Sequence, residues 1–225
     1  MAILLHNLLA RSPKLNDLGA VTKLLIAEDI AQDGMSDYTE EDLLADWHRT
    51  GFNMDVDAWI VVTNKGQYVG YADVWSSDYA QIEMRVRVHP AYRGRGIGTF
   101  LLRMAEMRAR QQATRACPGI RVTLHCAINA TNLTAKSLLD HEGYELVRHF
   151  WRMMVTSEEP HDGPHQSVKL KLDLMVNAQK LTGLTQRQPR TGIYVARQYD
   201  VYEKELRAGK ALCLDNVLDI QSVGA

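Results

Sequence analysis

The stretch Val86-Arg87-Val88-His89-Pro90-Ala91-Tyr92-Arg93-Gly94-Arg95-Gly96-Ile97-Gly98 decides the fold of this chain. Before it, apolar and charged residues alternate from Ile82 to Val88, which predicts a strand. Pro90 ends that strand, because proline has no N–H to donate to a ladder. After it, apolar residues recur at helical spacing from Ile97 to Met104. The stretch therefore predicts a strand, a tight basic turn and a helix.

Three glycines determine what the turn can bind. Gly94, Gly96 and Gly98 lack a Cβ, so the backbone is free to take positive φ and to approach a ligand closely. Such a turn presents successive N–H groups at the positive end of a helix dipole, and Arg93 and Arg95 add formal charge. A pyrophosphate group fits this chemistry. A plain surface turn is the alternative; a dinucleotide-binding turn fits less well, because it follows the first strand of a βαβ unit.

The spacing Arg93-x-x-Gly96-x-Gly98, after Val-x-Pro at a strand end, resembles motif A of the GNAT superfamily of acyl-CoA-dependent N-acyltransferases. The resemblance implies that acetyl-CoA is the co-substrate. It also implies that the turn holds the pyrophosphate and that the pantetheine arm runs along the preceding strand. The cofactor-binding residues it implies here are Val86, Arg87, Val88, Arg93, Gly94, Arg95, Gly96, Ile97 and Gly98.

The stretch Asn132-x-x-Ala135-x-x-Leu138-Leu139-x-x-x-Gly143-Tyr144 is similar to GNAT motif B, a helix whose start contacts the cofactor. The similarity adds Asn132 to the cofactor-binding residues. That Asn132 is simply the N-cap of the helix is an equally favoured alternative. Many family members carry a tyrosine that protonates the leaving thiolate where this chain has Leu139. A thiol with a pKa of about 8.5 is an adequate leaving group as a thiolate at neutral pH. The absence of the tyrosine therefore weakens the prediction of an enzyme without removing it.

Glu83 and Tyr144 are the candidate catalytic residues. Glu83, on the strand before the turn, would accept the proton of an attacking amine, and Asp73 is an alternative base. A cross-strand ion pair with a neighbouring arginine is the structural alternative for Glu83, and we favour it over catalysis. Tyr144 lies near Leu139 in sequence, although not on the same helical face. We interpret His125 as a core or edge histidine, because nothing nearby in sequence orients it.

The composition of the 225 residues is that of a globular protein with a sizeable core, at 46% hydrophobic and 24% charged. A net charge of −1 predicts no attraction to nucleic acid or membranes. The three cysteines are few and lack metal-site spacing, which predicts a reducing, cytoplasmic location and no metal. The apolar segment 1–9 is too short to span a bilayer.

Periodicity and turn residues predict an α/β protein: a mixed, mostly antiparallel sheet flanked by helices, with a C-terminal extension. The expected strands are 3–11, 58–63, 67–75, 81–88, 120–128 and 144–155. Helices are expected after 16–17, from 39 to 47 with a capping box, after the glycine turn, and over 129–142. This is also the GNAT arrangement. The segments 70–75, 88–90 and 150–153 further resemble the N-terminal module of mycothiol-synthase-like tandem GNAT proteins.

We divide the chain into a GNAT acetyltransferase domain over 1–157, a linker over 158–167, and a C-terminal extension of unassigned role over 168–225. Alternating residues predict a strand over 168–174, and 194–207 is predicted to be a helix closed by Gly209. The apolar row of the first segment requires a partner surface, so we expect packing against the domain or across a homodimer.

The resemblance implies an enzyme that transfers the acetyl group of acetyl-CoA to a primary amine by direct attack in a ternary complex. The acceptor is expected to be a small molecule or an N-terminal amine. Deprotonating an α-amine at neutral pH costs about 1 kcal/mol, against about 4 kcal/mol for a lysine side chain. The main alternative is a non-catalytic module that binds acyl-CoA for regulation or scaffolding; an interaction domain without a cofactor is a third.

Overall fold

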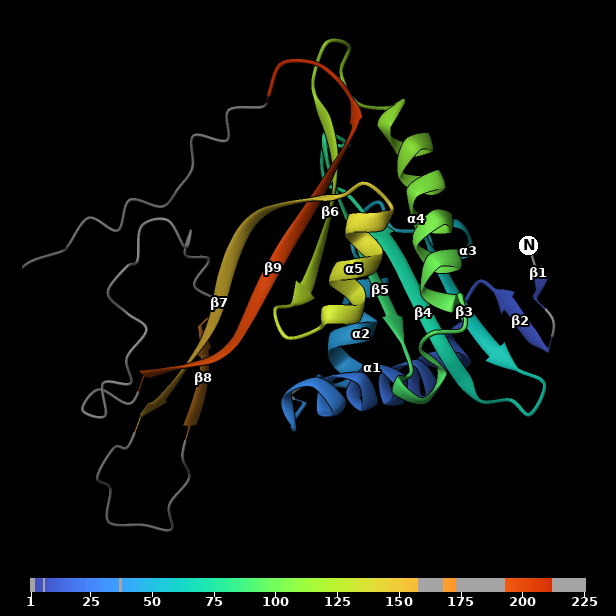
Figure 1. Cartoon of the computed structure of the whole chain (residues 1–225), viewed down its shortest axis with the longest axis vertical. Helices are drawn as coiled ribbons and strands as arrows, with labels where there is room; N and C mark the ends of the chain where they lie inside the picture. The colour runs from blue at the N-terminus through green and yellow to red at the C-terminus, as the bar shows by residue number, and fades with distance from the viewer. Residues whose placement is uncertain (1–2, 6, 37, 158–167, 173–192, 212–225) are drawn as a thin grey trace, which may run out of the picture.

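The computed structural model describes residues 3–5, 7–36, 38–157, 168–172 and 193–211 (Figure 1). In this part of the chain, nine strands form a single sheet in the order β1-β2-β3-β4-β5-β6-β9-β7-β8. Helices cover both faces, so the fold is the predicted mixed α/β sheet. Most pairs are antiparallel, and β5 with β6 is the parallel pair.

The first half of the sheet is an antiparallel series. The prediction of one strand over 3–11 is wrong, because β1 and β2 pair with each other as a short hairpin. The predicted strands 58–63 and 81–88 are confirmed at both ends. The five strands are β1 (Ile3–Leu5), β2 (Leu8–Arg11), β3 (Ala58–Thr63), β4 (Tyr68–Trp75) and β5 (Gln81–Val88).

Side chains cap the helices that begin at Glu40, Met54 and Leu133. The predicted capping box is confirmed: Thr39 Oγ1 accepts from the Asp42 N–H at 3.2 Å, and the Thr39 N–H donates to the Asp42 carboxylate at 2.9 Å. The helix predicted from 129 begins only at Leu133, because Asn129 still pairs with Tyr199 in the sheet. The α-helices are α1 (Leu18–Asp33), α2 (Glu40–Trp47), α3 (Met54–Asp57), α4 (Ile97–Ala113) and α5 (Leu133–His141).

The second half of the sheet contains a correction. The segment predicted to be a helix over 194–207 is a strand, β9 (Ile193–Arg207), which lies antiparallel between β6 (Val122–Asn129) and β7 (Glu145–Ser157) (Figure 1). Its residues are rich in aromatic and β-branched side chains, which favour a pleated surface. Its two neighbours satisfy backbone groups on both of its edges. The pattern was therefore read with the wrong period.

The C-terminal segment is thus joined to the sheet of the N-terminal part. The strand predicted from 168 is β8 (Val168–Leu172), which pairs with β7. The linker over 158–167, residues 173–174 of the predicted strand and most of the rest of the extension lie outside the described residues.

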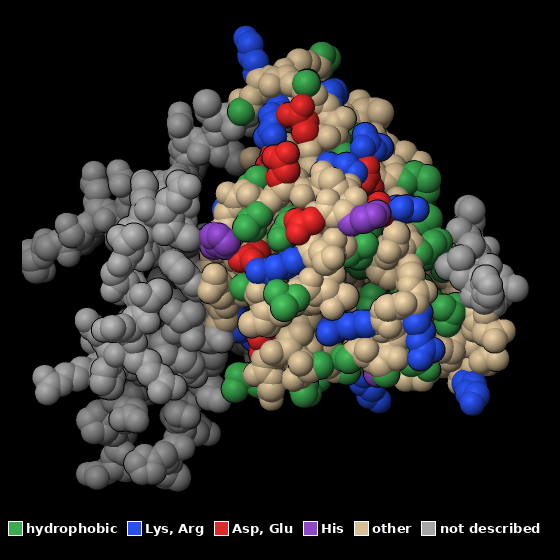
Figure 2. Space-filling model, viewed as in Figure 1, with side chains coloured by type: hydrophobic (Ala, Val, Ile, Leu, Met, Phe, Trp, Pro, Cys, Tyr) green, Lys and Arg blue, Asp and Glu red, His purple; other side chains and the backbone are tan. Residues whose placement is uncertain are grey.

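Two apolar cores lie on the two faces of the sheet. The larger packs α4 and α5 residues against β3 to β6, with Leu101, Leu102 and Leu124 fully buried. The smaller packs α1 and α2 against β3 and β4 around Leu43 and Tyr71. On the face that α4 and α5 cover, cationic and anionic side chains are interspersed (Figure 2). Among the described helices, none has both the length and the apolar character of a membrane span.

Candidate active site

β5 and β6 lie side by side for only part of their length. Their register runs from Gln81 opposite Thr123 to Met84 opposite Cys126. On its other side, β5 stays paired with β4 as far as Val88. In the described structure, residues 85–88 therefore have no partner strand on the β6 side. The backbone N–H and C=O groups on this edge are available to a ligand that lies between the two strands.

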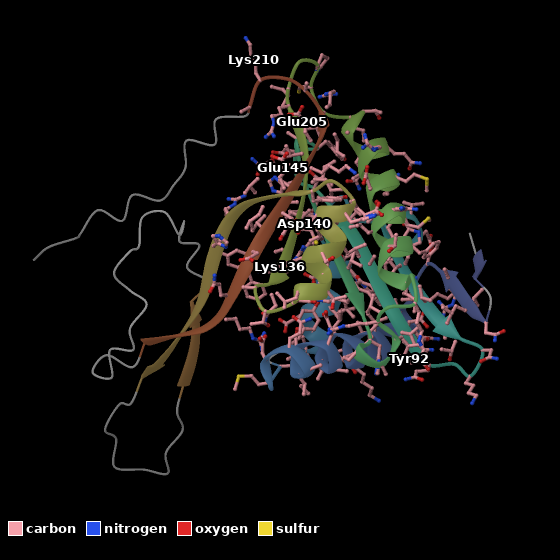
Figure 3. All side chains as sticks on the ribbon, viewed as in Figure 1. Tyr92, Lys136, Asp140, Glu145, Glu205 and Lys210 are labelled. Carbon is pink, nitrogen blue, oxygen red and sulfur yellow. The ribbon has the colours of Figure 1, made fainter. Side chains whose placement is uncertain are left out.

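A cleft of about 200 Å³ opens at this divergence, between the end of β5, the start of α4 and α5. Most of its lining is apolar side chain or glycine backbone. The predicted cofactor-binding residues that line it are Val86, Val88, Arg93, Gly94, Gly96, Gly98 and Asn132. In Figure 3, the ribbon passes Tyr92 as it enters α4, at the opposite end of that helix from Glu205 and Lys210.

The glycine turn has the conformation that the sequence predicts. Gly94 and Gly96 have φ values of 74° and 78°, a region that L side chains rarely adopt. Gly96 is the N-cap of α4, and the first N–H groups of a helix have no partner within it. A Cβ on Gly98 would lie 3.3 Å from Leu138 and 3.6 Å from Val88. The turn therefore offers donors, with little room for larger side chains.

Three predicted cofactor-binding residues do not line this cleft. The Nε of Arg87 lies 2.9 Å from the Glu28 carboxylate. Arg95 lies over the Tyr92 ring at 4.8 Å. Ile97 is 3% exposed and belongs to the larger core. Asn132 does line the cleft, and its side chain also accepts from the Ala135 N–H at 3.1 Å. The binding and N-cap interpretations of Asn132 are therefore compatible.

Glu28 on α1 is the residue of this site that the sequence analysis missed. It is 4% exposed, it lines the cleft, and its carboxylate lies 2.9 Å from Arg87 and 3.4 Å from Arg93. Burial raises the pKa of Glu28, and the two arginines act against that rise. The spacing along α1 could have revealed this residue. Glu28 lies three residues after Leu25 and seven after Val21, so it falls on the buried face of the helix.

The chemistry at the inner part of the cleft is apolar. Leu139 lines it and is 3% exposed, where the resemblance implies a tyrosine in many family members. Cys126 also lines it, but burial raises the pKa of its thiol to about 12, so the thiol stays protonated at neutral pH. Tyr144 is absent from the residues lining the cleft. It packs in the larger core, and its hydroxyl donates to Glu106 at 3.2 Å.

A second cavity, of about 340 Å³, lies on the opposite face of the same strands. Arg85 and Arg87 line it, whereas Val86 between them lines the cleft; likewise Ala127 lines it, whereas Cys126 lines the cleft. Successive strand residues point to opposite faces, so the two spaces lie on either side of the diverging β5 and β6. Residues of α1, β7 and β9 close the second cavity.

Arg85 is the hub of this second cavity. Its guanidinium donates to Asp46 at 2.7 Å, to Asp73 at 2.5 Å and to the Tyr38 hydroxyl at 3.0 Å. Arg85 and Arg87 thus pair with Asp73, Asp46 and Glu28 rather than with Glu83. The alternative that Glu83 forms an ion pair with a neighbouring arginine is wrong. Asp73, the alternative base, forms an ion pair with Arg85 instead. Glu83 is exposed and lines this cavity, and its carboxylate has no ion pair or hydrogen bond within the described structure.

His125 is better oriented than its sequence indicates. Its Nε2 lies 2.8 Å from the Glu203 carboxylate and 3.0 Å from Thr123 Oγ1. It is also the register partner of Glu83 across β5 and β6. The orienting residue, Glu203, comes from β9, so sequence neighbours of His125 could not reveal it. In the described residues, no group of His, Cys, Asp and Glu is arranged to hold a metal ion.

The family model of the acetyltransferase (GNAT) domain matches residues 55–146, which span β3 to α5. A search of curated proteins finds no match to the sequence. Among solved structures, a GCN5-related N-acetyltransferase from Sphaerobacter thermophilus is similar, with a TM-score of 0.75 at 21% identity over 93% of this chain and 99% of that chain.

Two further solved structures are similar in fold. The yncA protein of Salmonella typhimurium, solved with its cofactor acetyl-CoA, has a TM-score of 0.54 at 16% identity, covering 90% of this chain and 95% of that chain. The ribosomal-protein-S18-alanine N-acetyltransferase of Escherichia coli has a TM-score of 0.52 at 14% identity, covering 90% and 96%. At these identities the likeness concerns the fold.

Proposed function

We propose that this chain, whose residues 55–146 match the acetyltransferase (GNAT) domain model and whose fold is that of GNAT structures, acetylates a primary amine by direct attack of the amine on acetyl-CoA within a ternary complex. The observation that carries the proposal is the pair of cavities on opposite faces of β5 and β6. The strands diverge between the two spaces, so an acceptor in one and a thioester in the other would meet at the gap.

The residues of the cleft fit acetyl-CoA. The unpaired edge of residues 85–88 would bond the pantetheine arm, and a backbone N–H there would polarise the carbonyl. The N–H groups of the glycine turn and the first turn of α4 would hold the pyrophosphate, with Arg93 beside them. Gly98 leaves the space that a Cβ would fill. Acetyl-CoA supplies the acetyl group as a thioester.

Glu83 is the proposed proton acceptor. It lies in the second cavity, without a cationic partner in the described structure, so its carboxylate is available to an ammonium group. An amine must lose a proton as it attacks, and a positioned base contributes typically about 100- to 10,000-fold to such a step. Water is the alternative acceptor for an amine with a pKa of about 8, which costs about 1 kcal/mol to deprotonate at neutral pH.

The cleft supplies no tyrosine hydroxyl at Leu139, and this observation favours the second candidate, a module that binds acyl-CoA without turnover. We assign Tyr144 no part in the reaction, because its hydroxyl bonds to Glu106 in the core. The thiolate would therefore leave without protonation by a residue of α5. Leu139→Tyr is expected to raise the rate a few-fold if its hydroxyl reaches the sulfur.

The test combines acetyl-CoA titration by calorimetry with CoA release across a panel of primary amines, followed by thiol detection. Amine-dependent CoA release with kinetics that require both substrates to bind supports the proposal. Binding of acetyl-CoA without release for any amine would favour the binding module. Acetylation of the protein itself before the amine is added would replace direct attack with a covalent route.

A further inference from the structure

The charged side chains of the second cavity differ in whether they have a partner. Each of its four arginines has a carboxylate partner within the described structure: Arg49 with Asp46, Arg85 with Asp46 and Asp73, Arg87 with Glu28, and Arg197 with Asp29 and Asp33. Glu28 also pairs with Arg93, so these five carboxylates face five guanidinium groups in all, and Glu83 adds a sixth carboxylate that has no ion pair in the described structure. The arginines of the cavity are therefore neutralised by carboxylates of the protein, and the charge left without a partner is the negative charge of Glu83.

Aromatic side chains form much of the remaining wall. Trp75 is the direct cross-strand partner of Glu83 in the β4–β5 pairing, both residues line the cavity, and the Arg49 guanidinium lies over the Trp75 ring, 5.1 Å from its centroid. Phe150 of β7 and Tyr199 of β9 are stacked with their ring centroids 4.9 Å apart. Tyr38 completes the aromatic lining and is held by Asp46 and Arg85.

These two features select among amines. An acceptor with a carboxylate beside its amine, such as a free amino acid, needs a guanidinium that is not already neutralised. The described arginines of the cavity are all engaged by carboxylates, so that acceptor would bring a further anion into an anionic space. An ammonium group without a carboxylate would instead balance Glu83, and an apolar or aromatic body would pack on the rings.

We propose that the acceptor is a cationic primary amine that carries an aromatic or aliphatic body and no carboxylate. This inference rests on the proposed function, since it names the substrate class of the same site. The amine nitrogen lies between Glu83 and the gap that separates β5 from β6. The body of the acceptor lies against Trp75, Phe150 and Tyr199.

The test compares three amines that share a phenyl group: phenethylamine, phenylalaninamide and phenylalanine. The first two lack a carboxylate, and the amide matches the amino acid in size. Rates are measured over a range of pH and compared at the maximum of each profile, so that the different amine pKa values do not decide the order. We expect kcat/KM for phenethylamine and for phenylalaninamide to exceed that for phenylalanine by about 10- to 100-fold, the range for a charge left without a partner.

Equal or faster turnover of phenylalanine would overturn the inference while leaving the proposed amine acetylation intact. Turnover of phenethylamine with no turnover of phenylalaninamide would also count against it, because size rather than charge would then decide. If none of the amines, including aliphatic ones, gives CoA release while acetyl-CoA still binds, the proposed function fails and the inference fails with it.

A variant tests the aromatic wall separately. Trp75→Leu is expected to raise KM for phenethylamine about 10-fold and to leave KM for ethylamine nearly unchanged, since ethylamine has no body to pack on the ring. Trp75→Phe, which keeps an aromatic face, should recover most of the loss. The acetyl-CoA affinity of both variants reports that the fold is intact. An equal rise of KM for both amines would remove Trp75 from the acceptor site.

Discussion

The two cavities on either side of β5 and β6 are built from different materials. The cleft proposed for acetyl-CoA consists of strand edge, glycine backbone and apolar side chains, most of which fall within residues 86–139. The cavity proposed for the acceptor consists of charged and aromatic side chains from α1, the loops around α2, β4, β5, β7 and β9. A backbone-built site is encoded by a local pattern, whereas a site built from side chains depends on how distant segments meet.

The largest effect on the reaction rate is expected from the proposed proton acceptor in the acceptor cavity, Glu83. Glu83→Gln should lower kcat by about 100- to 10,000-fold for amines of high pKa, because it removes the proton acceptor. The dissociation constant of acetyl-CoA should not change, because Glu83 does not line the cleft. Steady-state kinetics and calorimetry measure the two quantities.

Glu145→Gln is the matched control, since Glu145 is an exposed carboxylate on β7 that does not line the cavity. It should leave kcat within twofold of the unaltered chain. An unchanged kcat in Glu83→Gln would assign the proton to water and would leave Glu83 only its part in binding the ammonium group.

The next effect concerns the backbone-built cleft. Gly98→Val should weaken acetyl-CoA binding by about 10- to 100-fold, because its methyl groups would meet Leu138 and Val88 in the space left for the ligand, and such overpacking costs about 1–3 kcal/mol. Gly98→Ala should lose less, because its single Cβ is close only to the end of the Leu138 side chain, at 3.3 Å, and lies at ordinary contact distance, 3.6 Å, from Val88. Calorimetry with both variants measures the difference.

Gly96 tests the same cleft through conformation rather than space. At φ 78° a Cβ would meet no protein atom within 4 Å, so Gly96→Leu should act through the left-handed backbone, which costs about 1–2 kcal/mol, and through the bulk of its side chain in the cleft. Gly96→Asn should bind acetyl-CoA better than Gly96→Leu, because asparagine tolerates this region. Equal affinities for the two variants would show that the turn conformation does not limit binding.

A smaller effect is expected at the Arg85 hub. Among the described residues, Asp46→Asn removes one of the two carboxylates on Arg85 and the single carboxylate on Arg49, and it should lower the free energy of unfolding by about 1–3 kcal/mol. It should raise KM for the acceptor several-fold while the acetyl-CoA affinity stays the same. Thermal denaturation and kinetics test this; a loss of acetyl-CoA affinity would mean that the two cavities are energetically coupled.

The smallest effect is expected at Glu28, which lies between the two regions. Glu28→Gln removes a negative charge within 3.4 Å of Arg93, beside the proposed pyrophosphate site, and should tighten acetyl-CoA binding by a few-fold at low salt. Raising the salt concentration should reduce that gain. Weaker binding at all salt concentrations would show that Glu28 is needed to position Arg93.

The sequence predicted those features that neighbouring residues specify. The alternation before Pro90 and the spacing of the glycines define the strand, turn and helix, and the Thr39 capping box defines the start of α2. The strand β9 was missed because its identity depends on the gap between β6 and β7, which no local pattern describes. For the same reason, Glu203 beside His125 could not be anticipated.

The same distinction between local patterns and contacts of distant segments applies to the site. Seven of the residues predicted for the cofactor line the cleft, because the turn brings its own neighbours together. The Arg87 side chain does not line it, since strand alternation places that side chain on the opposite face, against Glu28, so Arg87 would hold the cofactor only through its backbone on the unpaired edge of residues 85–88. Tyr144 was chosen for its nearness to Leu139 in sequence, but the start of β7 turns it into the core.

The position of β9 also constrains how the chain becomes a folded protein. β6 and β7 are separated by only a helix in sequence, yet they do not pair with each other, because each pairs with β9. Residues 193–207 are synthesised after both β6 and β7, so the edges of these two strands stay open until β9 has left the ribosome. Contacts of such long sequence separation close slowly and leave an exposed strand edge during synthesis. Pairing of β9 with β6 and β7 is therefore a late step of assembly, and a chain that stopped before residue 193 would have a sheet open at its middle.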